Sequence, residues 1–417
     1  MGNQKGNQPG EGFTPLNFAI GGFEAIIIPP MRSRVSVVRC PGYESRELSS
    51  SIGTALDLIG GIESVLKPGS KVFVKINHLS PGSAPERAIV THPLFTREVL
   101  RFLKDLNMDV TVGDDIQFEG EDGYLISGYQ YMCREMGVRL INLKSEGFRE
   151  VPCPKGQAVQ SVHIAAAALD ADGVIDLAKL KTHAFTAFTG AVKNMFGVIP
   201  CGLRLKYHNR FPRNEVFSRM LVDVFSCLPP VLTLMDAVTA MEGPGPSGGP
   251  PRTVGLVLAG RDAVAVDAVA QSIIGFGPDD ILTTRYAAER LLGTARLDSI
   301  DIAGERLQNV RVDGFKKAAF PVGLLERKLP SAIYAFVSGR LILLPEVAAD
   351  KCIGCQECFK VCPAGAVRME GGKARILKKP CIHCLCCHEV CRSNAIKLRQ
   401  RLLGRLVRFF SSVFKIA

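Results

Sequence analysis

The sequence contains no tryptophan, and only 7% of its 417 residues are aromatic. It has no uninterrupted run of about 20 apolar residues, so a membrane-spanning helix is not expected. The segment Met1–Glu24 is polar and rich in glycine and lacks the apolar core of a cleavable signal, which predicts a cytoplasmic protein. Because no aromatic platform or known nucleic-acid-binding module accompanies the basic residues, nucleic acid is not an expected partner.

Familiar nucleotide-binding and hydrolase motifs are also missing. No G-x-G-x-x-G follows the first predicted strand, so a dinucleotide site has no support. No G-x-S-x-G nucleophile elbow is present. The glycine- and proline-rich loop 242–250 lacks the Gly-Lys-Ser/Thr ending of a phosphate-binding loop, and we interpret it as a loop at the rim of a site.

The cysteines and the net charge are concentrated at the C-terminal end. Residues 351–417 hold nine of the 14 cysteines and all of the net charge of +11, whereas residues 1–350 hold 37 basic and 37 acidic residues. With 47% hydrophobic and 22% charged residues, the composition is that of a globular protein. We therefore predict an N-terminal extension (1–34), an α/β domain (35–325), a linker (326–350), a cysteine-rich domain (351–397) and a tail helix (398–417).

Short β-branched runs alternate with segments of helical periodicity in the first half of the chain. The runs predict strands at Val35–Val38, Val72–Ile76, Val110–Val112, Val138–Leu143, Gly173–Leu177, Val231–Met235 and Thr253–Leu258. The periodic segments predict helices at Leu48–Leu66, Leu94–Leu106 and Leu125–Met136. This alternation predicts an α/β fold with a mainly parallel sheet and helices on both faces. Ligands of such folds bind beyond the carboxyl ends of the strands.

Polar side chains follow several of these predicted strands. For any single carboxylate a cap or turn role is the alternative, and Asp262 is well placed to cap the helix that contains Asp267. Convergence of many such groups at one sheet edge favours a binding site. We predict the following substrate-binding residues: Asn77, Asp114, Lys179, Lys206, Asp236, Glu242, Asp262 and Asp267.

The segment from Lys179 to Arg210 combines lysines and histidines with small and apolar residues. Lysines close to apolar groups and to one another have lowered pKa values and can act as bases or Schiff-base nucleophiles, or hold anionic substrates. Histidine supplies an acid, a base or a metal ligand. A solvated basic face is the alternative, but the interleaved Phe185, Phe188 and Phe196 favour a site. The predicted catalytic residues are Lys181, His183, Lys193, Asn194 and His208.

Two cysteine runs with the same spacing form the most specific pattern in the chain. Each run is C-x2-C-x2-C-x3-C, the bacterial ferredoxin arrangement, in which the fourth cysteine ligates the neighbouring cluster. Zinc is the alternative, since it also takes four thiolates, usually from C-x2-C pairs, but two matching ferredoxin runs favour iron–sulfur clusters. The predicted ligand sets for two 4Fe-4S clusters are Cys352, Cys355, Cys358 with Cys391, and Cys381, Cys384, Cys387 with Cys362.

The remaining cysteines show no ligand spacing. Cys386 breaks the second repeat and is interpreted as a spare thiol. Without an export signal, clustered cysteines are expected as metal ligands rather than as disulfides. We predict that the other five are small buried hydrophobes, although Cys201 lies inside the lysine- and histidine-rich segment; they are Cys40, Cys133, Cys153, Cys201 and Cys227.

The segment Leu398–Ala417 contains no acidic residue, and helical spacing places its apolar and basic residues on opposite halves. A basic amphipathic helix is typical of a segment that contacts a membrane surface or a protein. Packing onto the body of the same chain is the alternative. We therefore expect a cytoplasmic protein with peripheral membrane contact through this helix as one hypothesis.

Several motifs together resemble the domain-of-unknown-function family numbered 362. They are Lys181-Thr182-His183, the run Gly190–Gly197, Asp236 with Glu242–Pro246, and Ala259–Asp262 with Asp267. Members of this family are described as iron–sulfur cluster-binding proteins, often with a C-terminal ferredoxin domain. The resemblance covers roughly residues 35–300 and the cysteine-rich part, and it implies an α/β domain joined to two 4Fe-4S clusters without implying a known reaction.

The order and spacing of His183, Lys193, His208 and Asn209 are also similar to the segment by which lactate-racemase-type enzymes hold a nickel-pincer cofactor. The resemblance implies that Lys193 anchors a cofactor and that His208 ligates a metal. The sequence departs from that family at Ala191-Val192, where the family has Gly-Arg. An additional metal or organic cofactor in the α/β domain is thus a further hypothesis.

These patterns lead to a predicted oxidoreductase that exchanges electrons between a redox partner protein and an anionic or carbonyl-bearing substrate. Lys181, Lys193 and Lys206 would hold the substrate, and His183 or His208 would supply protons. A non-catalytic electron-transfer or ligand-binding protein is the alternative. Convergence of the lysines and histidines on a closed pocket with displaced pKa values would favour the enzyme.

Overall fold

A computed structural model describes residues 33–78, 80, 83–116, 121–318, 329–330, 333, 337 and 341–400, and the backbone of strands β1 (Ala19–Ile20) and β2 (Phe23–Glu24). Apart from the backbone of β1 and β2, the predicted N-terminal extension up to residue 32 lies outside these residues, as do most of the predicted linker and the tail beyond residue 400. The membrane contact expected of the tail therefore stays a prediction. In the described part of the chain, none of the helices combines the length and apolarity that crossing a membrane requires.

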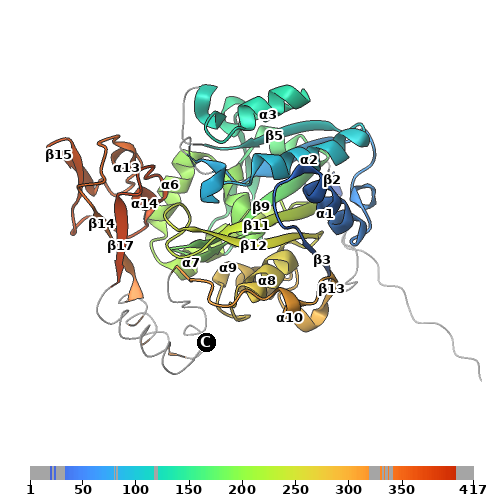
Figure 1. Cartoon of the computed structure of the whole chain (residues 1–417). Coiled ribbons are helices and arrows are strands. Elements are labelled where there is room, and N and C mark those ends of the chain that lie inside the picture. The colour runs from blue at the N-terminus through green and yellow to red at the C-terminus, as the bar shows by residue number, and fades with distance from the viewer. Residues whose placement is uncertain are drawn as a thin grey trace, which may run out of the picture.

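A mixed sheet of nine strands forms the centre of the α/β domain (Figure 1). The strands follow the order β13 (Ile300–Gly304), β3 (Ser33–Arg39), β12 (Pro251–Gly260), β11 (Leu232–Met241), β9 (Gly173–His183), β4 (Lys71–Ile76), β5 (Asp109–Asp114) and β6 (Arg139–Asn142), and β10 (Ala187–Thr189) pairs with β9. Only β12 and β10 run antiparallel to their neighbours in the described sheet. The predicted mainly parallel sheet is confirmed.

Helices cover both faces of this sheet (Figure 1). One face packs against α1 (Ser45–Asp57), α2 (Pro93–Asp105) and α3 (Tyr129–Met136). The other packs against α5 (Ala191–Asn194), α7 (Asn214–Cys227), α8 (Ala263–Ile273) and α9 (Leu282–Glu289). The chain also forms α4 (Ala166–Leu169), α6 (Cys201–Arg210) and α10 (Leu307–Val310). Alternate residues of β4 point to opposite faces, Phe73 into one core and Val72 and Val74 into the other, as a strand buried on both sides requires.

One predicted helix is shorter than expected. The periodic segment Leu48–Leu66 forms a helix only as far as Asp57. Gly60 and Gly61 then adopt positive φ values of 92° and 75°, a conformation that glycine reaches without steric cost and that ends the helix.

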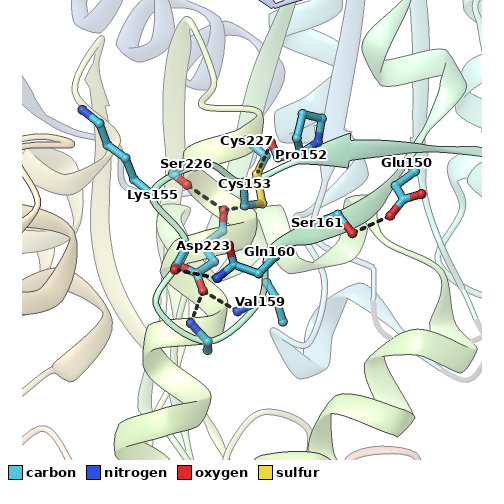
Figure 2. Close-up of a disulfide and its surroundings, with 12 residues drawn as sticks. Glu150, Pro152, Cys153, Lys155, Val159, Gln160, Ser161, Asp223, Ser226 and Cys227 are labelled. Atoms are coloured by element: carbon cyan, nitrogen blue, oxygen red, sulfur yellow. Dashed lines mark hydrogen bonds between the residues drawn. A yellow bond between two sulfur atoms is a disulfide. The ribbon is translucent and has the colours of Figure 1, made fainter.

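A disulfide joins Cys153, just after β7 (Phe148–Pro152), to Cys227 at the end of α7. The expectation that both residues are unpaired buried thiols is therefore wrong, because the fold brings together cysteines 74 positions apart, which spacing cannot reveal. Figure 2 shows Asp223 of α7 beside this disulfide, with its backbone carbonyl oxygen toward Cys153 and its carboxylate toward the turn around Val159. The carboxylate accepts backbone hydrogen bonds from the turn before β8 (Ser161–Ala165), including 2.7 Å from Ala158 and 3.0 Å from Val159. The disulfide and the hydrogen bonds of Asp223 thus both connect this turn to α7.

The cysteine-rich domain, residues 341–400 in the structure, is a small α+β unit. Strand β14 (Leu343–Val347) pairs with β17 (Ile396–Gln400), and β15 (Val367–Glu370) pairs with β16 (Lys373–Ile376). Two short helices, α13 (Glu357–Lys360) and α14 (Cys386–Glu389), lie between them. The first strand of the domain therefore falls among residues predicted as linker, and residues 398–400 extend a strand instead of starting the tail helix.

Candidate functional site

The second cysteine set surrounds one cavity of the cysteine-rich domain. Cys362, Cys381, Cys384 and Cys387 line it together with apolar side chains that include Val367. Burial, and the neighbouring thiols of this set and of Cys358, raise the pKa of Cys387 well above its ordinary value. A cubane cluster needs four thiolates in an apolar, largely enclosed space, so these residues fit a 4Fe-4S cluster in the predicted pairing of three from one run and one from the other.

The first cysteine set converges in the same way. Burial, and then the neighbouring thiols of Cys391, Cys355 and Cys352, raise the pKa of Cys358 to about 11. Backbone N–H groups donate to the sulfurs, 3.4 Å from Ala374 to Cys352 and 3.2 Å from Ala395 to Cys391. Such donors stabilise thiolates that carry a cluster's negative charge.

Buried lysines lie at the carboxyl ends of the parallel strands. Lys75 pairs with Asp114 at 2.8 Å, and Lys179 pairs with Asp236 at 2.6 Å. All residues of β9 are buried, so Lys179 and the nearby Lys181 lie inside this strand and not in a loop after it. Each buried ammonium group is compensated by a neighbouring acid or acceptor, as the cost of desolvation demands.

Lys181 has a different environment from the other two strand lysines. Its ammonium group donates to Asn77 Oδ1 at 2.7 Å and to a backbone carbonyl, and no carboxylate pairs with it in the described structure. Burial, and then the charge of Lys193, lower the pKa of Lys181 to about 7. Burial also lowers the pKa of Lys193. Both lysines are thus cations held in surroundings that disfavour their charge.

Three of the predicted catalytic residues converge on a carboxylate of the cysteine-rich domain. His183 at the end of β9, Lys193 in α5 and His208 in α6 surround Glu389, which belongs to α14. The His183 Nε2 atom lies 3.1 Å from Glu389 Oε1. Although burial acts in the opposite direction, the interactions with these three residues, including the hydrogen bond with His183, lower the pKa of Glu389 on balance. We call Lys181, His183, Lys193 and His208 the cation site.

The hydrogen bonds of His183 fix which ring nitrogen carries its proton. The Nδ1 atom accepts from the backbone N–H groups of Phe185 at 3.1 Å and Thr186 at 3.3 Å. Burial lowers the pKa of His183 to about 3, so the ring is neutral near pH 7 and its single proton sits on Nε2. The geometry therefore makes His183 Nε2 a proton donor on the side of Glu389 and leaves no Nε2 lone pair for a metal.

His208 is packed among aromatic rings beside the same site. Its ring stacks on Phe217 with centroids 4.3 Å apart, and its Nδ1 atom has no hydrogen-bond partner in the described structure. Burial lowers the pKa of His208 to about 4. Among the described residues, no three His, Cys, Asp or Glu side chains are grouped so that they could hold a single metal ion.

Two further predicted residues, Asp267 and Asn194, hold the short helix α5 in position through hydrogen bonds. Asp267 in α8 accepts hydrogen bonds from the backbone N–H groups of Ala191 at 2.6 Å and Val192 at 3.1 Å, which holds the N-terminus of the short helix that carries Lys193. Asn194 donates to Asp176 at 2.6 Å and accepts from Asn77 at 2.8 Å, joining α5 to β9 and β4. Both side chains position the cation site.

Three predicted residues lie elsewhere or face other partners. Asp262 caps α8 as predicted, accepting from Val264 N and Ala265 N. The expectation that Asp262 converges with the other carboxylates is wrong. Strand β12 is antiparallel to its neighbours, so the residues that follow it lie at the amino ends of the parallel strands, opposite the candidate site. Lys206 is exposed on α6, and Glu242 accepts from Lys316 N at 3.0 Å. Their predicted substrate-binding roles remain untested.

Two residues of the site were not found from the sequence. Lys75 interrupts the apolar run of β4. Because a charged side chain in a strand that is buried on both faces needs a compensating partner, this lysine was a detectable signal. Glu389 stands in the second cysteine run where the first run has Lys360, and this reversal of charge between matching positions was the available signal.

Both the α/β domain and the cysteine-rich domain match known protein families. Residues 72–272 match the model of a domain of unknown function (DUF362), and residues 344–392 match that of a 4Fe-4S dicluster domain. A thylakoid-associated protein of Synechocystis sp. is 31% identical over 263 residues, which cover 63% of this chain and 80% of that protein.

Solved structures with a similar arrangement are more distant. The lactate racemase apoprotein from Thermoanaerobacterium thermosaccharolyticum shares 13% identity at a TM-score of 0.37, over 55% of this chain and 54% of that chain. A protein from Thermotoga maritima shares 11% identity at a TM-score of 0.36, over 60% of each chain. The chain thus spans about half the length of the racemase.

Proposed function

The chain belongs to the DUF362 family and is an iron–sulfur electron-transfer protein with a 4Fe-4S dicluster domain, and from this premise we propose that it is an oxidoreductase. Its substrate would be an anionic or carbonyl-bearing molecule bound at the cation site. Two clusters, held by the ligand sets described above, would supply or accept the electrons.

The observation that carries this proposal is the contact between Glu389 and His183. Glu389 lies two residues beyond Cys387, a predicted ligand of the second cluster, and its carboxylate reaches His183 Nε2 at 3.1 Å. Leu385 of the same run packs with Ala184, the residue after His183. The cavity of the second cysteine set therefore lies beside the cation site, where electrons and a bound substrate would meet.

The side chains of the cation site suit the reduction of a polar, anionic molecule. Lys193 remains half-buried while the other members are buried, so an incoming anion would meet Lys193 first. His183 would donate its Nε2 proton to an oxygen atom that gains negative charge, as general acids do. Convergence of these groups with lowered pKa values favours an enzyme over a purely electron-carrying protein.

The affinity of the cation site for anions is expected to fall as the pH rises through about 7. Lys181 is charged in its protonated form, which exists below its pKa, and burial lowers that pKa to about 7. Titrating the anaerobic protein with pyruvate as a carboxylate probe by calorimetry, between about pH 6 and pH 8.5, should show about tenfold weaker binding at the upper end.

The matched variant is Lys181→Met, which keeps the length of the side chain and removes its charge. It should bind the probe weakly at every pH and lose the dependence on pH. Equal affinity of the unaltered protein across this range, or stronger binding at high pH, would contradict the role of Lys181.

A second candidate is a racemase-type enzyme that uses an additional metal cofactor. It is favoured by the buried Nδ1 atom of His208, which has no hydrogen-bond partner in the described structure and lies beside Lys193. In this proposal Lys193 would anchor the cofactor and His208 would bind the metal. Nickel-free protein with a Lys193 of unmodified mass after anaerobic purification would exclude it.

A further inference from the structure

The two cysteine runs are structurally equivalent halves related by a shift of 29 positions. Gln356 and Leu385 occupy the same place before α13 and α14, and both adopt positive φ values, 65° and 67°. The turns that follow close with the same hydrogen bonds, 2.9 Å from Phe359 N to Gln356 O and 2.8 Å from His388 N to Leu385 O. Each residue of one run therefore has a counterpart with the same orientation in the other.

The face of the second run is covered by the α/β domain. Leu385 packs with Ala184, and Glu389 meets His183 at 3.1 Å. His388 Nε2 lies 2.9 Å from the carbonyl oxygen of Pro244, and Ser247 donates to the carbonyl oxygen of His388 at 3.0 Å. We call Leu385, His388 and Glu389 the inner face of the domain.

The counterparts of these residues in the first run are exposed. Gln356, Phe359 and Lys360 correspond to Leu385, His388 and Glu389, and we call them, together with Ile353, the outer face. Ile353 is 63% exposed and Phe359 is 44% exposed, and both directly follow a predicted ligand of the first cluster. In the described part of the chain, the hydrogen bonds and ion pairs of residues 352–360 stay within the cysteine-rich domain.

The view of the whole chain agrees with this difference. Figure 1 shows α14 on the side of the cysteine-rich domain that faces α6, with α13 and β15 farther from the α/β domain. One half of an internal repeat thus docks on the chain itself, while the equivalent half presents apolar and polar side chains to solvent. Because Ile353 and Phe359 each directly follow a predicted cluster ligand, they lie where an electron carrier would have to approach this cluster.

The charge of the outer face indicates the kind of partner. The inner face places the acid Glu389 against a site of cations, whereas the equivalent position of the outer face is Lys360. Lys351 and Lys373 are exposed beside it, while Glu357 is engaged at 3.6 Å by both Lys360 and Arg392. Asp350 and Glu370 are further acids of this part of the domain, and Glu370 is engaged at 2.8 Å by Arg375, so the cations Lys351, Lys360, Lys373, Arg375 and Arg392 outnumber the acids.

We propose that the outer face docks a small acidic electron-carrier protein. Phe359 and Ile353 would provide the apolar centre of the contact, and the lysines around them would attract the negative surface of the carrier. For each electron that the reduced carrier loses, the cluster held by Cys352, Cys355, Cys358 and Cys391 would gain one. This docking site uses the dicluster domain alone and does not depend on the substrate of the proposed reaction.

Binding of two electron carriers of opposite charge tests this docking site. Calorimetry with the full-length anaerobic protein would use an oxidised acidic [2Fe-2S] ferredoxin and a basic c-type cytochrome. The ferredoxin should bind and the cytochrome should not, and the affinity for ferredoxin should fall as salt is added. Because both carriers are oxidised, the readout is binding and not turnover.

Variants of the outer face sharpen the test. Phe359→Ala and Lys360→Glu should each raise the Kd for ferredoxin about tenfold, since central aromatic residues and contacting charges dominate such interfaces. Lys397→Glu, an equal charge change on exposed β17, is the matched control and should leave Kd unchanged. Unaltered iron content in all three variants would show intact folding.

Three results would overturn the proposal. They are tighter binding of the cytochrome than of the ferredoxin, unchanged Kd in both outer-face variants, and an equal loss of affinity in Lys397→Glu. Failure to turn over any substrate would leave these binding results intact, so the docking site and the proposed reaction are tested separately.

Discussion

Replacement of Cys387 by alanine is expected to lower the iron content from about eight to about four atoms per chain, since it removes a predicted ligand of one of the two predicted clusters. Cys387 lines the cavity of the second cysteine set, and its thiol is surrounded by those of Cys362, Cys381 and Cys384. Iron and sulfide quantification of anaerobically purified protein measures the effect, and EPR of the reduced state should lose one of two interacting signals.

The neighbouring Cys386 provides the matched control. It is buried in the same helix, and the cavity is lined by Cys384 and Cys387 but not by Cys386. Cys386→Ala should therefore retain all of the iron. An equal loss of iron in the two variants would contradict the assigned ligand set, and bound zinc in place of iron would contradict the clusters themselves.

Loss of the cation site is expected to have the second large effect. His183→Ala should lower kcat/KM about 10²- to 10⁴-fold, because it removes the proton donor fixed by the backbone of Phe185 and Thr186. Lys193→Ala should lower it about 10- to 100-fold, because an anionic substrate loses its first cationic contact. The measurement is steady-state reduction of a panel of 2-oxo acids with a chemical electron donor.

Lys206→Ala is the control for these two variants. Although the sequence predicted Lys206 as a substrate-binding residue, it is exposed on α6 and is not a member of the cation site, so its replacement should leave kcat/KM within about twofold. If Lys206→Ala were as damaging as Lys193→Ala, or if His183→Ala retained full activity, the reaction would not take place at the cation site.

Local sequence patterns predicted most of the strands of the sheet, but they did not predict that β12 is antiparallel to its neighbours. Val72–Ile76 and Val110–Val112 are recognisable because strands buried on both faces are rich in β-branched and other apolar residues, even though Lys75 interrupts the first run. The run Thr253–Leu258 looks the same, yet β12 is antiparallel. An apolar run does not show whether its strand is parallel or antiparallel to its neighbours. The sequence therefore placed Asp262 at the wrong end of the strands.

The candidate site was likewise predictable only where it depends on residues close together in the sequence. The spacing of the cysteines and the composition of the segment around Lys193 predicted the two parts of the candidate site. The contact between His183 and Glu389 joins residues far apart in the sequence, and nothing local to either specifies it. The disulfide between Cys153 and Cys227 escaped prediction for the same reason.

The central claim is that docking of the cysteine-rich domain brings its second cluster to the cation site, and Gly248 permits a direct test. A Cβ atom at Gly248 would collide with the ring of His388, so Gly248→Val should separate the two domains while leaving the cysteines and the cation site in place. The decisive measurement is stopped-flow reoxidation of the dithionite-reduced protein by the 2-oxo acid that the unaltered protein reduces fastest. We predict that Gly248→Val reoxidises at least about tenfold more slowly despite unchanged iron content, whereas equal rates would contradict the claim.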